Sequence, residues 1–168
     1  MLRFLLIFGA LMGLFYVVFQ LPPKEYPTVG NFFTRYLGFY ARISGVVLAA
    51  FGYDISVTGQ NISSPEYSVR IVRGCDAIEA TAIFVAAVLA SPVPPRPKIP
   101  GILAGILLLG VTNLIRIASL FYIGIHFPRL FDTMHADVWQ TVFILLAVCF
   151  WLIWATWARR RTAPHVLA

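Results

Sequence analysis

The sequence predicts an all-α integral membrane bundle with a small β-hairpin outside the membrane. Of 168 residues, 60% are hydrophobic and only 12% are charged, whereas a soluble domain has about 25% charged residues. The apolar residues gather into runs of roughly 20, the length that spans a bilayer. The basic residues behind the net charge of +6 are scattered or stand at the ends of these runs, as in membrane proteins. These observations exclude a soluble globular enzyme, a disordered chain and a nucleic-acid-binding protein, and they predict one membrane-embedded domain over residues 1–168.

The first expected element is an N-terminal anchor helix within residues 1–22. The apolar run over residues 2–21 is interrupted only by Arg3 and Gln20, and prolines follow it. A signal peptide is the competing interpretation, but no small-x-small cleavage site follows the run. We therefore expect an uncleaved transmembrane anchor.

Residues 31–52 predict an amphipathic helix. Polar and small residues recur at every third or fourth position, which places them along one face of a helix. They are Asn31, Arg35, Gly38, Arg42 and Gly45. Such a helix can lie in the membrane interface or can span the membrane with this stripe facing the bundle. We favour the interface, because an anchor that runs outward already places residue 75 outside.

Residues 53–74 predict an external β-hairpin. Apolar and polar side chains alternate from Ile55 to Thr58 and again from Tyr67 to Ile71. A period of two is typical of half-buried strands. Turn-forming residues separate the two runs, as in a hairpin. The hairpin directly precedes a cysteine at the start of the next apolar run.

Residues 75–158 predict a core of three further spans. Apolar runs extend over residues 77–91, 99–125 and 138–158. A proline cluster closes the first run, and three arginines after the last run begin a basic tail at 159–168. With the N-terminal anchor this makes four firm spans, and a fifth if the amphipathic helix crosses.

Charges between the spans predict their orientation. The loop expected at 92–100 carries Arg96 and Lys98 and no acidic residue, and the tail carries three consecutive arginines. The positive-inside rule makes both segments cytoplasmic. The loop expected at 122–135 is then external, together with the cysteine end of the core.

Ionisable side chains in membrane spans are costly, and by default they are functional candidates. Cys75 opens one span at its outer end, and His135 stands at the outer entrance of the last. Arg116 lies about 7 Å below the expected outer end of its span at 1.5 Å per residue. A thiol, a base and a fixed cation at one membrane depth suit nucleophilic catalysis. His126, which has no polar companion in the external loop, is the weaker histidine.

The surroundings of the cysteine also point to reactivity. A helix N-terminus and the neighbouring Arg73 should lower the pKa of the Cys75 thiol, although Asp76 and Glu79 oppose them. The alternative interpretation is that Cys75 is a small apolar filler. We assign that role to Cys149, which stands in mid-span among apolar residues.

Two polar residues should support Arg116. Glu79 is at i+4 from Cys75, and Asn113 is at i−3 from Arg116, so each pair shares a helix face. We expect Glu79 to orient Arg116 toward the thiol. The alternative is a purely structural ion pair between Arg116 and Glu79.

Other chemistries lack their motifs. There is no Cys-x-x-Cys pair, no His, Cys and carboxylate set with metal-ligand spacing, and no phosphate loop. Cys149 lies on the order of 20 Å below the outer surface, too deep to pair with Cys75. We therefore expect neither a metal nor another cofactor.

Three motifs in this order resemble those of the exosortase/archaeosortase family of integral-membrane cysteine transpeptidases. They are Val72–Thr81 around Cys75, Asn113–Ile117 around Arg116, and His135. The resemblance covers residues 37–157 and is greatest to the short single-domain form, exosortase H. In that family the cysteine is commonly followed by Asn or Ser and then by Gly, whereas Asp76 and Ala77 stand here.

The resemblance implies a bacterial inner-membrane enzyme whose site lies on the outer, periplasmic face. Such an enzyme cleaves the C-terminal sorting signal of membrane-anchored exported proteins. Cys75 would form a thioester, Arg116 would stabilise the oxyanion and His135 would transfer protons. The hairpin can bind the extended recognition motif as an added strand. The acyl acceptor stays open between water, a lipid and a polysaccharide amine.

The rival hypothesis is a small non-enzymatic membrane scaffold or assembly factor. In that case Arg116 and Glu79 form only a structural pair, and Cys75 only begins a helix. A transporter is disfavoured, because no charged side chain lies in the inner half of the three core spans.

Overall fold

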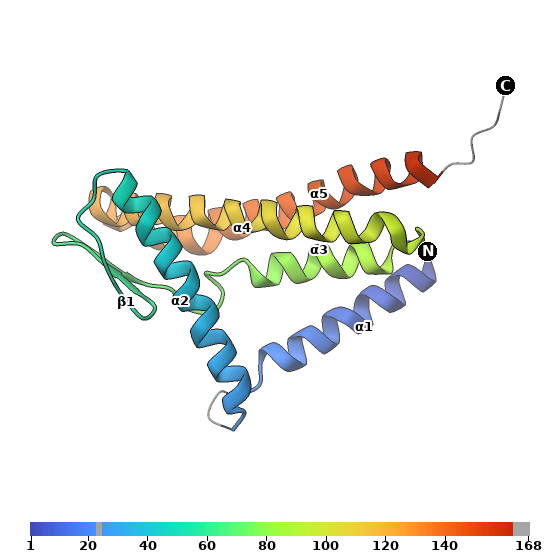
Figure 1. Ribbon diagram of the computed structural model, residues 1–168, viewed down its shortest axis with the longest axis horizontal. Coiled ribbons are helices and arrows are strands. Elements are labelled where there is room, and N and C mark those ends of the chain that lie inside the picture. Colours follow the sequence, from blue (N-terminus) through green and yellow to red (C-terminus); the bar gives the residue numbers. More distant parts are fainter. Residues whose placement is uncertain (23–24, 163–168) are drawn as a thin grey trace.

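The structure is a computed structural model that describes residues 1–22 and 25–162. A bundle of helices fills one end of the molecule, and a helix and a small sheet cover the other end (Figure 1). The elements in chain order are α1 (Leu2–Phe19), α2 (Pro27–Ala50), β1 (Ser56–Thr58), β2 (Asn61–Ser63), β3 (Ser68–Arg70), α3 (Ile78–Ala90), α4 (Pro95–His126), η1 (Pro128–Leu130), η2 (Thr133–Val138) and α5 (Trp139–Thr162). The predicted class, a mostly helical chain with long apolar helices and a small β-hairpin, is confirmed.

Three helices of the described chain are long and apolar enough to cross a membrane: α1, α4, and α5 together with η2. The prediction of four firm spans is therefore wrong. The helix expected over 77–91 is α3, which has 13 residues and a length of about 20 Å, whereas the hydrocarbon core is about 30 Å thick. It packs against α1, α4 and α5. We interpret α3 as a short helix buried inside the bundle.

Backbone breaks limit α3 at both ends. Gly74 and Ala77 have φ angles of 90° and 55°, so regular helix begins only at Ile78. At the other end Ser91 is extended, because the residue before a proline is disfavoured in a helix. The chain thus enters the bundle through an irregular turn that contains the cysteine.

The end of the bundle that was expected to be cytoplasmic has less loop than predicted. The loop expected at 92–100 is mostly the first turns of α4, which begins at Pro95 because proline fits the first turn of a helix. Helix α5 likewise continues to Thr162, into the expected basic tail. Residues 163–168 of that tail lie outside the described residues.

The outer end also has less loop than predicted. Where an external loop was expected at 122–135, α4 continues to His126 and is followed by a 3₁₀ turn, η1, and a π-helical segment, η2. Helix α4 therefore has 32 residues and is about 48 Å long. Because this exceeds the thickness of the hydrocarbon core, part of α4 is free to carry the outer layer.

Close contacts between glycines and aromatic rings hold the inner bundle together. Gly105 of α4 lies against the ring of Phe84 in α3, and Gly101 lies against Trp154 in α5. The Trp154 indole also donates a hydrogen bond of 3.0 Å to the Pro97 carbonyl. A side chain at either glycine would collide with its ring, so these positions set the helix separation.

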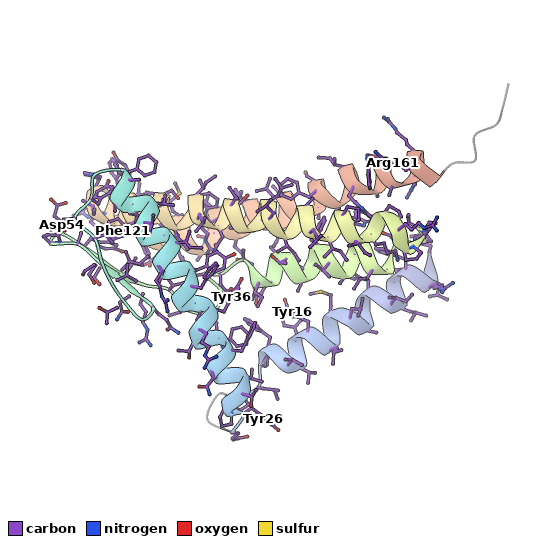
Figure 2. The ribbon with its side chains drawn as sticks, in the orientation of Figure 1. Tyr16, Tyr26, Tyr36, Asp54, Phe121 and Arg161 are labelled. Carbon is purple, nitrogen blue, oxygen red and sulfur yellow. The ribbon has the colours of Figure 1, made fainter. Side chains whose placement is uncertain are left out.

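The outer layer consists of α2 and the sheet, packed on the outer part of α4. Helix α2 spans residues 27–50 rather than the predicted 31–52, and it is not among the helices apolar enough to cross. In Figure 1 it runs obliquely past the ends of α1 and α3, which suits the interfacial alternative. The core of this layer comprises Leu37, Ala41, Leu48, Ile62, Ile71, Ile117 and Phe121. In Figure 2, Phe121 lies at this end and Arg161 at the opposite end.

The predicted stripe on α2 divides between two environments. Its glycines, Gly38 and Gly45, are buried, and Gly45 packs closely on the Val57 side chain of the sheet. Its arginines, Arg35 and Arg42, are exposed. The small residues of the stripe thus allow close packing, and the charged residues mark its solvent-facing edge.

The predicted hairpin is present, with one strand more than expected. Its three strands are antiparallel in the order β1-β2-β3. Val57 pairs with Ile62, and Ile62 pairs with Val69. Strand β3 ends at Arg70, a short distance along the chain from Cys75. The sheet is therefore joined directly to the turn that holds the cysteine.

Candidate active site

The three side chains predicted to lie at one level do come together. Cys75 lies in the turn between β3 and α3, Arg116 lies within α4, and His135 lies in η2. The Cys75 Sγ and His135 Nε2 atoms are 2.8 Å apart, within hydrogen-bonding distance. The π-helical turn places the imidazole over the thiol, and such turns are frequent at functional sites.

Arg116 ties the cysteine segment to the histidine segment. Its Nη1 donates to the Gly74 carbonyl at 3.3 Å, and its Nη2 donates to the His135 carbonyl at 3.2 Å. The side chain is only 2% exposed, and its guanidinium carbon lies 5.5 Å from the centre of the Phe143 ring. A planar guanidinium makes two such bonds in one geometry, which a lysine ammonium does not. Arg116 therefore holds the two segments in register and places a positive charge beside them.

The supporting residues expected around Arg116 do not bond to it. No ion pair joins Arg116 and Glu79 in the described chain, so that prediction is wrong. Because the segment between Cys75 and Glu79 is an irregular turn, the i+4 relation that placed them on one helix face does not apply. Asn113 is fully buried one turn before Arg116, but its amide has no hydrogen-bond partner among the described residues.

Arg73 is directed away from the thiol. Its Nη1 donates to the Phe19 carbonyl at 3.1 Å, and its guanidinium carbon lies 4.1 Å from the centre of the Phe33 ring. Arg73 therefore joins the cysteine segment to α1 and α2. Its role is anchoring, not the activation of the thiol that the sequence predicts.

The Cys75 thiol is half-buried. Burial raises the pKa of Cys75, and a backbone hydrogen bond at Val72 and the positive charge of Arg116 offset only part of that effect. The predicted lowering of the pKa is therefore wrong, because Cys75 precedes the helix by a turn and Arg73 points elsewhere. A thiol with a raised pKa reacts faster with a base in contact with it, and His135 Nε2 is in that position.

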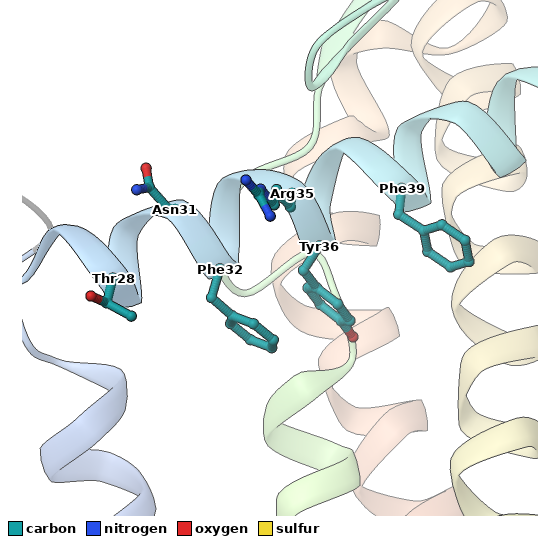
Figure 3. Close-up of a pocket in the computed structure, with 6 residues that line it drawn as sticks. All are labelled: Thr28, Asn31, Phe32, Arg35, Tyr36 and Phe39. Atoms are coloured by element: carbon teal, nitrogen blue, oxygen red, sulfur yellow. The ribbon is translucent and has the colours of Figure 1, made fainter.

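Asp76 and Tyr36 hold the cysteine turn from the other side. The Asp76 side chain is fully buried, and its Oδ1 accepts a hydrogen bond of 3.3 Å from the Ile78 N–H. The Tyr36 hydroxyl donates to the Asp76 carbonyl at 3.1 Å, and Figure 3 shows its ring directed from α2 toward the start of α3. Burial raises the pKa of Asp76. Tyr36 has no signal in the sequence that could have marked it.

A cavity of about 390 Å³ opens beside the thiol. Its lining comes from β3 with the residues that flank it, from α4, and from residues 131–135 around the start of η2. Cys75, Arg116 and His135 are among the lining residues. The Phe131 ring stacks on His135 with a centroid distance of 5.7 Å and an interplanar angle of 5°. This stacking fixes the orientation of the imidazole, and no sequence pattern predicts it.

The other groups in the described chain are less suited to catalysis. A larger groove of about 580 Å³ runs along α2 (Figure 3), but it is lined only by residues of that helix and has no nucleophile. The His126 ring packs against Tyr122 in a tilted arrangement, with ring centroids 4.4 Å apart, and His126 does not line the cavity beside Cys75. Within residues 1–22 and 25–162, no group of three His, Cys, Asp or Glu side chains is placed to hold a metal ion.

The family is decided by a match over most of the chain. The family model described as transmembrane exosortase (Exosortase_EpsH) matches residues 4–152. The chain belongs to the transmembrane exosortase family. The resemblance inferred from the three motifs is thereby confirmed. Comparisons with curated proteins and with solved structures give no match.

The exosortase match begins much earlier than residue 37, where the motifs placed it. It includes α1 and α2, so the anchor and the oblique helix belong to the family region. It also includes the turn in which Ala77 replaces the glycine expected from the resemblance. With its φ of 55°, Ala77 adopts a conformation that glycine takes at no steric cost.

Proposed function

We propose that this exosortase is a membrane cysteine transpeptidase that cleaves the C-terminal sorting signal of membrane-anchored exported proteins. The observation that carries the proposal is the 2.8 Å contact between Cys75 Sγ and His135 Nε2. The two hydrogen bonds of Arg116 hold the segments on which these atoms lie. A nucleophile within reach of a base that a third group orients is the arrangement of covalent catalysis.

The reaction has two halves. In the first, His135 Nε2 takes the thiol proton as Cys75 Sγ attacks a peptide carbonyl, and Arg116 stabilises the developing oxyanion. The peptide C–N bond then breaks, His135 protonates the leaving amine, and a thioester remains. In the second half, His135 deprotonates an acceptor that attacks the thioester and releases Cys75. Water, a lipid and a polysaccharide amine are the candidate acceptors.

We place this site at the outer, periplasmic face of the bacterial inner membrane. Arg116 is 21 residues after Pro95 (116 − 95), the first residue of α4. This corresponds to about 32 Å of helix, close to the thickness of the hydrocarbon core. The three arginines at the end of α5 lie at the Pro95 end of the bundle (Figure 1), and the positive-inside rule makes that end cytoplasmic.

The proposal is tested on the C-termini of membrane-anchored proteins. We would compare these C-termini by mass spectrometry in cells that produce the native chain, Cys75→Ala or Cys149→Ala. Cys149 is the matched control, because it is also a free cysteine but lies on the exposed surface of α5. The native chain and Cys149→Ala should yield shortened C-termini, whereas Cys75→Ala should leave the sorting signal attached. Equal processing by Cys75→Ala would contradict the proposal.

The same measurement separates the enzyme from a membrane scaffold. The scaffold hypothesis depended on a structural pair between Arg116 and Glu79, which the described chain does not contain. A scaffold would leave every C-terminus unchanged in all three strains. If processing does occur, the mass of the new C-terminus identifies the acceptor.

A further inference from the structure

We propose that the free edge of β3 is a docking site for an extended peptide, which adds to the sheet as a fourth strand and so presents its carbonyl to Cys75. This inference rests on the proposed function and specifies how that function selects its substrate. The ligand is a peptide segment in β conformation with apolar side chains at alternate positions.

The register of the sheet shows which backbone groups of β3 are free. Ser64 N–H bonds to the Tyr67 carbonyl, and Ile71 N–H bonds to the Gln60 carbonyl. In an antiparallel pair, alternate residues direct both backbone groups to the same side. Tyr67, Val69 and Ile71 therefore face β2.

The intervening residues, Ser68 and Arg70, must then direct their N–H and C=O groups away from β2. Both residues are exposed, and β3 is a terminal strand of the sheet. An incoming strand forms backbone hydrogen bonds with such groups regardless of its sequence.

The two edges of the sheet differ in their surroundings. Strands β1 and β2 both pack against α2. Strand β3 instead lines the 390 Å³ cavity over its whole length. Exposed edges invite strand pairing, and proteins usually cover or charge them. An edge left open toward a cavity that contains the thiol is therefore placed to pair with a substrate.

The cavity continues from this edge to the reacting atoms. It is bordered by residues 67–72 and also by Cys75 and His135. A strand that pairs with Ser68 and Arg70 lies along the same wall. Its backbone is thereby brought toward Cys75 Sγ without a turn.

Apolar side chains also line the cavity. Ile117, Leu120 and Phe131 are among its lining residues. Because successive side chains of a strand point to opposite faces, every second residue of the peptide contacts these groups. Asp132 is the acidic residue of the lining and disfavours an acidic peptide residue next to it.

The test compares two alkylating reagents on the full chain in its membrane. Iodoacetamide reaches the thiol without a peptide, whereas acetyl-Val-Ala-Val-Ala chloromethyl ketone carries an extended peptide; each forms an S–C bond and releases a halide. The chain contains two cysteines, so Cys149→Ala is used as background and only Cys75 is labelled. Arg70→Pro and Arg70→Ala both remove the side chain, but only proline removes the outward N–H, and edge strands tolerate proline.

We expect the ratio of the peptidyl rate to the iodoacetamide rate to be roughly 3- to 10-fold lower in Arg70→Pro than in Arg70→Ala, the effect of one hydrogen bond. Equal ratios in the two variants would overturn edge docking and leave the proposed function standing. A native Cys75 that iodoacetamide does not label would instead contradict the proposed function.

A second series guards against misfolding of the proline variant. Reagents with a single N-methyl group at successive peptide positions are applied to the chain with native Arg70. Edge pairing predicts slow labelling at every second methyl position, because alternate peptide N–H groups face β3. A uniform effect along the peptide would overturn the proposal, whatever the behaviour of Arg70→Pro.

Discussion

The core of the helix bundle differs in composition from the region where the bundle meets α2 and the sheet. We call this second region the junction. The bundle core is a cluster of alanines, valine, leucine and aromatic rings in α3, α4 and α5. At the junction, by contrast, lie the buried charged side chains of the described chain, Asp76 and Arg116, with buried Asn113 beside them. Asp76 Oδ2, Arg116 Nε and both amide atoms of Asn113 have no hydrogen-bond partner among the described residues.

This difference shows how the work is divided between the two regions. Unsatisfied buried polar groups cost about 1–3 kcal/mol each, and such violations are expected where function requires them. Apolar burial in the bundle supplies the stability that offsets this cost. Substitutions at the junction should therefore change activity, and substitutions in the bundle should change stability.

The largest effect on the junction is expected for His135→Gln. Without the base, the raised pKa of Cys75 leaves the thiol protonated, and processing should fall by about 10²- to 10⁴-fold. His126→Gln is the matched control, since His126 packs against Tyr122 and does not line the cavity. The measurement is the rate of C-terminal processing, and equal rates in the two variants would rule out His135 as the base.

The next largest effect is expected for Arg116→Lys, in which processing should fall by about 10²- to 10³-fold. Lysine keeps the charge but cannot make both hydrogen bonds, to the Gly74 and His135 carbonyls. Arg129→Lys, on exposed η1, controls for the exchange itself. If Arg116→Lys retains full processing, the positive charge alone suffices and the two hydrogen bonds to the backbone are dispensable.

The bundle side of the comparison is tested by Gly105→Ala. The new methyl collides with Phe84, and overpacking of this kind costs about 1–3 kcal/mol. Gly9→Ala in α1 meets nothing within 4 Å and should be neutral or slightly stabilising. Thermal unfolding in detergent measures both changes. If Gly105→Ala lowers processing per folded molecule without lowering stability, the proposed division between a stabilising bundle and a catalytic junction is wrong.

The smallest effect concerns the pH dependence of the thiol. Because burial raises the pKa of Cys75, its thiolate fraction should rise with pH through a midpoint above the ordinary thiol range. Arg116→Met should move this midpoint higher still, since the arginine charge lowers the pKa. Labelling rates with iodoacetamide across pH provide the measurement. A midpoint below the ordinary thiol range would contradict the raised pKa and support the lowered pKa that the sequence predicts.

The sequence predicts well which residues come together, but it predicts less well which contacts they make. Composition and spacing place Cys75, Arg116 and His135 at one level, because long helices carry side chains to depths that can be counted. The pairing of Glu79 with Arg116 failed because it assumed regular helix from Cys75 onward. Two left-handed residues in that turn are visible only in three dimensions.

Non-local contacts were equally out of reach. Phe131 stacks on His135 and Tyr36 bonds to the Asp76 carbonyl, yet neither aromatic residue differs in sequence from the many that pack the bundle. The strand alternation did predict a sheet before the cysteine. Which strand of that sheet forms the cavity wall depends on the pairing order.

The central claim is that Cys75 carries the acyl group during turnover. The most direct measurement is mass spectrometry of the full chain isolated from cells that contain its substrates, with and without hydroxylamine, which cleaves thioesters. We expect an acyl adduct that maps to Cys75, is released by hydroxylamine and is missing from Cys75→Ala. Continued processing with an unmodified Cys75, or a hydroxylamine-sensitive adduct on Cys149, would contradict it.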